Sequence, residues 1–131
     1  MTFPIIDIST KKWNYEDLME YVCYDEYIYT NKESVFEKYY KNKLFCDGNG
    51  QIYKAIGKAE MTEKWRNWLR FIPNVWKTKI VFKNMYKEMP VEELRTFLLE
   101  RISDLKQDDF TRQWKVDVQK AKTHSELIND K

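Results

Sequence analysis

The residue types that most often carry out catalysis are scarce in this sequence. It contains one histidine, His124, and two cysteines, Cys23 and Cys46. His124 lies in a polar C-terminal stretch that we expect to be frayed and exposed, whereas a Ser/His or Cys/His mechanism needs a histidine oriented by a third group on a rigid element. The cysteines lack C-x-x-C spacing and, with a single histidine, cannot build an ordinary structural zinc site. We therefore expect two buried, reduced thiols and no metal site.

Carboxylates are the remaining candidates for catalysis. A pair of acids can hydrolyse a glycoside or hold a metal ion, but neither spacing signature is present. The stretch D-G-N-G-Q from Asp47 begins like an EF-hand loop, yet Ile52 stands at the glycine position and Lys58 at the glutamate position. Five acids do gather near one predicted N-terminal helix: Glu16, Asp17, Glu20, Asp25 and Glu26. Because acids on a helix surface are usually only solvated, we predict a protein that is not an enzyme and has no cofactor.

Tyrosines are interleaved with these acids. Four of them exceed what one helical stripe can bury, so some should be exposed. Tyrosine is favoured at protein interfaces because it offers a large rigid contact with a polar tip. Ordinary aromatic packing is the alternative. The predicted protein-binding residues are Tyr21, Tyr24, Asp25, Glu26, Tyr27 and Tyr29.

The charge of the chain is unevenly distributed. The net charge is +2, but residues 31–87 carry thirteen Lys and Arg against five acids. This basic middle third can pack against the acidic ends of the chain within one fold. Alternatively, it can form a phosphate-binding surface, which by itself would not recognise a particular nucleotide sequence. Lysines on a solvated strand also blunt edge pairing. The residues of the alternative nucleic-acid surface are Lys54, Lys58, Arg66, Arg70, Lys77, Lys79 and Lys83.

The segment K-W-R-N-W-L-R-F-I-P-N-V-W-K, residues 64–77, combines three tryptophans with four cations. On a helix over 63–72, Trp65 and Trp68 fall on an apolar stripe, whereas Arg66 and Arg70 fall on another face. A base-stacking platform needs rings and cations presented together, and a membrane-surface helix would be longer. We therefore expect these tryptophans to belong to the core.

The order of the elements indicates an α+β fold. Asn14 is a plausible N-cap for a helix over 15–27, and D-G-N-G at 47–50 is a strong hairpin turn. A C-terminal tail over 123–131 should be frayed. We expect a small, mainly antiparallel, three- to four-stranded sheet with helices packed on one face. Its strands should be 44–46, 51–57 and 75–83, with a short strand or arm at 4–8 and further helices after 30, at 63–72, 90–105 and 108–122.

Length and composition indicate the number of domains and the class of protein. A chain of 131 residues with 43% hydrophobic residues can form a single compact domain over 1–131. The apolar runs are far shorter than the ~20 residues needed to span a bilayer, and the N-terminus lacks signal-peptide features. We therefore predict a non-enzymatic cytoplasmic protein without membrane association that binds another protein, as inhibitors, adaptors and immunity-type proteins do. The alternative is a nucleic-acid-associated protein that uses the basic residues between 54 and 83.

Overall fold

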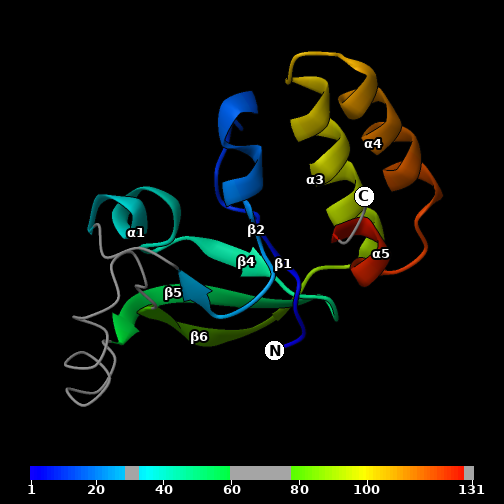
Figure 1. Cartoon of the computed structure of the whole chain (residues 1–131). Helices are drawn as coiled ribbons and strands as arrows, with labels where there is room; N and C mark the ends of the chain where they lie inside the picture. The colour runs from blue at the N-terminus through cyan, green and yellow to red at the C-terminus, as the bar shows by residue number, and fades with distance from the viewer. Residues whose placement is uncertain (29–32, 60–77, 129–131) are drawn as a thin grey trace.

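The computed structural model describes residues 1–28, 33–59 and 78–128, and within these ranges it is an α+β fold (Figure 1). The predicted fold class is therefore confirmed. The elements are β1 (Ile5–Asp7), the 3-10 helix η1 (Tyr15–Glu20), β2 (Val22–Cys23), β3 (Tyr27–Ile28), α1 (Glu33–Tyr39), β4 (Leu44–Cys46), β5 (Gln51–Ala59), β6 (Thr78–Glu88), α3 (Val91–Ser103), α4 (Asp109–Lys120) and α5 (His124–Ile128).

The strands form one antiparallel sheet in the order β2-β1-β4-β5-β6-β3, which gives six strands in the described residues instead of the expected three to four. The difference comes mostly from residues 22–28. The predicted helix over 15–27 is wrong beyond Glu20, where η1 ends. Two short strands follow it, in a stretch rich in β-branched and aromatic residues that favour strand conformation.

The sheet is strongly curled. Its two edge strands, β2 and β3, are separated in sequence by only the residues 24–26. Four Cα–Cα steps of about 3.8 Å reach at most about 15 Å. A flat sheet would hold the first and sixth strands about 24 Å apart, at about 4.8 Å per neighbouring pair. The edges must therefore bend toward each other, as in an incompletely closed barrel.

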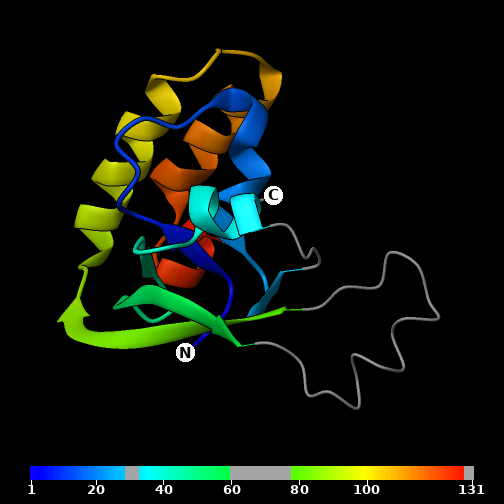
Figure 2. The ribbon, with the colours of Figure 1, turned by 90° about the vertical axis from the view of Figure 1, so that its left-hand side faces the viewer.

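Side chains on the two faces of the sheet pack into two separate hydrophobic clusters. Successive residues of a strand point to opposite faces, so Ile5 and Phe45 join one cluster and Ile6 and Cys46 join the other. α1 packs with the first cluster through Phe36. The second cluster holds the buried residues of α3, α4 and α5, and α3 lies beside α4 in both views (Figures 1 and 2). The three C-terminal helices thus share one face, and α1 occupies the other, so the expected packing of the helices on one face is wrong for α1.

α3 and α4 begin at residues that are typical of helix N-termini. α3 begins after Pro90 and buries Leu94, Leu98 and Ile102, which confirms the predicted helix over 90–105 apart from its ends. α4 begins at a capping box in which the Asp108 carboxylate accepts a hydrogen bond from the Thr111 N–H. The Asp108 cap supplies a partner for a backbone N–H group that a helix start otherwise leaves unpaired, whereas Pro90 makes no side-chain cap hydrogen bond.

The tail is structured as far as residue 128, so the prediction of a frayed tail is wrong for residues 124–128; residues 129–131 lie outside the described residues. Leu127 is 0% exposed and Ile128 is 4% exposed. His124 is half-buried, and its Nε2 lies 2.6 Å from the carbonyl oxygen of Met89. Ser125 Oγ donates to the carbonyl of Gly48 at 3.0 Å. Two adjacent apolar side chains in a polar stretch provide the burial that anchors α5.

Candidate protein-binding surface

The predicted tyrosine and acid residues divide between core and surface. Tyr21 is 5% exposed and stacks on Trp13 with ring centroids 5.0 Å apart, so it belongs to the core. Tyr24 is exposed. The Asp25 carboxylate accepts a hydrogen bond from the Tyr27 N–H at 2.9 Å and thereby shapes the bend between β2 and β3. Tyr29 lies outside the described residues.

The predicted basic residues also divide, because they lie on different faces of the sheet. Lys79 and Lys83 alternate with the inward-facing Ile80 and Phe82 along β6. Lys54 is the direct cross-strand partner of Lys83, so these side chains share a face. Lys58 instead pairs with Ile80 and places its ammonium group 5.7 Å from the ring centroid of Phe36, on the opposite face. Arg66, Arg70 and Lys77 lie outside the described residues.

The fold brings part of both predicted surfaces together. β3 pairs with β6, and Tyr27 stands directly opposite Lys79. The Glu26 carboxylate lies 3.8 Å from the Lys79 ammonium group. The acidic, tyrosine-bearing segment therefore borders the lysine row. We call this combined area the outer β5–β6 face; it comprises Lys54, Ile56, Lys79, Val81 and Lys83, with Glu26 and Tyr27 at its border.

Two aliphatic side chains occupy the middle of this face. The register shifts between Ala55 and Gly57, so Ile56 and Gly57 together oppose Val81 in a β-bulge. Ile56 is 49% exposed and Val81 is 38% exposed. Both views show β5 and β6 along the lower edge of the molecule, with the helices above them (Figures 1 and 2). Ile56 is not among the binding residues predicted from the sequence; the neighbouring Gly57, inside a strand pattern, is the signal of a bulge that the sequence contains.

A second irregularity presents an aromatic ring to solvent. Tyr86 has a φ of 54° and is 87% exposed. Its N–H donates to Asn84 Oδ1 at 2.8 Å, which stabilises the turn. A non-glycine residue in the left-handed region is uncommon and strained. The chain therefore maintains an unfavourable backbone conformation at a position whose side chain is almost fully exposed.

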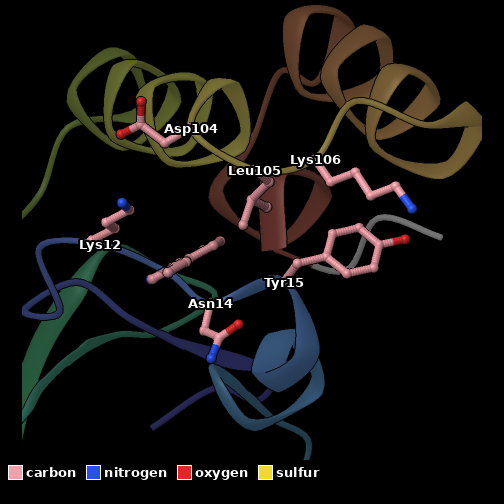
Figure 3. Close-up of a pocket in the computed structure, with 7 residues that line it drawn as sticks. Lys12, Asn14, Tyr15, Asp104, Leu105 and Lys106 are labelled. Carbon is pink, nitrogen blue, oxygen red and sulfur yellow. The ribbon is translucent and has the colours of Figure 1, made fainter.

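A small pocket lies between the loop before η1 and the loop that joins α3 to α4 (Figure 3). Its volume is about 360 Å³, and its lining is Lys12, Trp13, Asn14, Tyr15, Asp104, Leu105 and Lys106. In Figure 3, Lys12 and Asp104 lie on one side, with Tyr15 and Lys106 on the other. Because Trp13 and Leu105 are almost fully buried, they offer a ligand little apolar surface. The lining therefore favours no particular ligand.

One hydrogen bond beside this pocket couples two titratable groups. The Tyr15 hydroxyl donates to the Asp108 carboxylate. This bond raises the pKa of Tyr15 and lowers the pKa of Asp108. The indole nitrogens of Trp13 and Trp114 are buried nearby and have no hydrogen-bond partner among the described residues. The Tyr15–Asp108 bond joins η1 to the start of α4 and accounts for both pKa shifts without a ligand.

The two thiols are unsuited to nucleophilic chemistry. Both are buried, as expected, and neither forms a disulfide. Burial raises the pKa of Cys23 to about 12, and it raises the pKa of Cys46 to about 12 as well. A thiol attacks as its thiolate, so at neutral pH each is protonated and unreactive. Within the described residues, no group of three or more His, Cys, Asp or Glu side chains is arranged to hold a metal ion.

Comparison with models of known families, with curated proteins and with solved structures gave no significant match. In the described ranges, no helix has both the length and the apolar character required to cross a bilayer.

Proposed function

We propose that this protein is a non-enzymatic, cytoplasmic binding protein that recognises another protein through the outer β5–β6 face. The observation that supports this most is the exposure of Ile56 and Val81 on neighbouring strands. They form an apolar centre, and charges of both signs surround it. An apolar centre with a polar rim is the usual composition of a protein interface.

An inhibitor, an adaptor or an immunity-type protein would fit this description. Such proteins need a rigid surface and no catalytic group. The outer β5–β6 face lies on β5 and β6, which the sheet holds between β4 and β3. Strands in the interior of a sheet hold their side chains more precisely than a loop does. Pre-organisation of this kind reduces the entropy lost on binding.

Nucleic-acid binding is the second candidate, and the lysine row favours it. Two observations weigh against it. Lys58 lies on the other face of the sheet, and Lys79 is paired with Glu26. The aliphatic centre also provides no ring on which a base could stack. Salt dependence separates the candidates. A protein neutralising six to ten phosphates loses about 10³–10⁵ in affinity between 50 and 200 mM salt, whereas an apolar-centred protein complex changes far less.

The proposal can be tested by making the apolar centre polar. We expect the pair Ile56→Gln and Val81→Gln to abolish cross-linking to a specific protein from native lysate while the variant stays folded by circular dichroism. Val116→Gln is a matched control, because Val116 on α4 is exposed to the same 38% as Val81. Retention of the cross-linked partner by the double variant, or its equal loss from the Val116→Gln control, would show that this face is not the binding site.

A further inference from the structure

Lys54 and Lys83 form a like-charged pair on the outer β5–β6 face. They are direct cross-strand partners in an antiparallel ladder. Side chains in such positions have Cβ atoms about 4.5–5.5 Å apart, and like charges there repel each other. Neither ammonium group has an ion-pair partner in the part of the chain that the structure describes, whereas Lys79 on the same face is paired with Glu26. Among the described residues, Lys54 and Lys83 are thus two adjacent, uncompensated cations.

The usual structural reason for lysines on a strand does not apply to Lys54. Lysines commonly protect an edge strand from pairing with another chain. Lys54 pairs with Leu44 of β4 on one side and with Lys83 of β6 on the other, so it lies in the interior of the sheet. Among the described residues β3 pairs with β6 only at Thr78 and Lys79, so edge protection can account for Lys83 but not for Lys54. The repulsion between the two ammonium groups would be relieved by an anion that contacts both.

The neighbours of the pair define the anion. Ile56 follows Lys54 by two residues, and Val81 precedes Lys83 by two residues. Two residues of strand span about 6.6–6.8 Å. A ligand that bridges the lysines therefore meets an aliphatic surface about 7 Å away. A phosphate backbone gains nothing from that aliphatic surface. A protein segment that carries an acid and an aliphatic residue at this separation fits both the lysine pair and the aliphatic surface.

We infer that Lys54 and Lys83 bind a carboxylate of an acidic protein partner, whose neighbouring aliphatic side chain packs on Ile56 and Val81. On an extended segment the acid and the aliphatic residue would be two positions apart, and on a helix four positions apart. This inference rests on the proposed function and specifies the chemistry of the partner. The carboxylate accepts hydrogen bonds from both ammonium groups and removes their mutual repulsion.

The test uses the full chain and a set of fluorescent 12-residue peptides built from three Glu-Ser-Val-Ser repeats. Matched peptides replace every Glu by Gln or by Lys, and a 12-nucleotide thymidine strand is the phosphate probe. We expect anisotropy titrations to show the Glu peptide binding at least tenfold more tightly than the Gln peptide. The pair Lys54→Gln and Lys83→Gln should remove that preference. The control pair Lys120→Gln and Lys122→Gln, which removes two exposed cations at the end of α4, should retain it. The pair Lys54→Glu and Lys83→Glu should bind the Lys peptide instead.

The failure of this inference is distinguishable from that of the proposed function. Equal binding of the Glu and Gln peptides, or no binding of either, overturns the carboxylate site. If the Ile56→Gln and Val81→Gln pair nevertheless loses a cross-linked protein partner, the proposed function stands without the carboxylate site. Tighter binding of the thymidine strand than of the Glu peptide, lost in the Lys54→Gln and Lys83→Gln pair, would overturn the inference in favour of a phosphate ligand.

Discussion

Replacing Leu127 by alanine should destabilise the protein severely. The Leu127 side chain is completely buried in the core that α3, α4 and α5 share with the sheet. Leu→Ala substitutions at such sites cost about 2–5 kcal/mol, which combines the lost transfer free energy with the cost of the cavity left behind. A domain has only about 5–15 kcal/mol of stability in total. One substitution in the last helix should therefore remove a large part of the free energy of unfolding.

Urea denaturation followed by circular dichroism measures this effect directly. We expect the midpoint to fall while the slope of the free energy against urea stays constant, because the amount of surface exposed on unfolding hardly changes. Lys122→Ala is the control. Lys122 is exposed in the short link between α4 and α5, and its side chain makes no hydrogen bond within the described residues.

The result that would refute this reasoning is a cost of about 0.5 kcal/mol or less for Leu127→Ala, similar to the control. Such a value is typical of exposed positions. It would mean that α5 does not form a stable part of the core and that the frayed tail expected from the sequence is the better description.

Two other predictions concern backbone strain and ionisation. Gly50 has a φ of +87°, and a Cβ there would lie 2.6 Å from His124 Nε2, so Gly50→Ala should cost more than about 1 kcal/mol in urea denaturation. At Gly57 a Cβ would meet nothing within 4 Å, so Gly57→Ala should be neutral or slightly stabilising; equal costs would contradict the described turn. Stability should also fall as pH rises above about 9, because Cys23 and Cys46 ionise near 9 when unfolded and only near 12 when folded. Their contribution is complete below the unfolded pKa and is lost above it at up to about 1.4 kcal/mol per pH unit for each thiol. Replacing both cysteines by alanine should flatten this dependence between pH 9 and 10; an unchanged slope would show that the thiols are not its source.

Local signals in the sequence were enough to predict several elements. The turn at 47–50 is held by the Asp47 carboxylate, which accepts hydrogen bonds from the N–H groups of Asn49 and Gln51, as its composition indicated. The strand expected over 75–83 is confirmed for residues 78–83, where Ile80 is buried and Lys79 and Lys83 are exposed; it continues to Glu88, and residues 75–77 lie outside the described residues. In each case the information lies within a few neighbouring residues. The expected core position of Trp65 and Trp68 falls outside the described residues.

The parts that could not be predicted depend on distant residues. β2 and β3 have two residues each and exist only because β1 and β6 lie beside them. The candidate site depends on register in the same way. The bulge at Ile56 inserts one residue into β5, which places Lys54 and Lys58 on opposite faces. No count of charges along the sequence contains that information, so the sequence predicted one basic patch, whereas the fold separates Lys58 from Lys54.

The pairing of the N-terminal strands has a consequence for synthesis on the ribosome. β1 pairs with β4, and β3 pairs, within the described residues, only with β6, at residues 78 and 79. The N-terminal segment therefore emerges from the exit tunnel about fifty residues before its last strand can pair, at roughly 5–20 residues per second. Pairings of such large sequence separation are slow to form because loop-closure entropy must be overcome first. During that interval Tyr27 and Ile28 have no β6 residues with which to form their backbone hydrogen bonds.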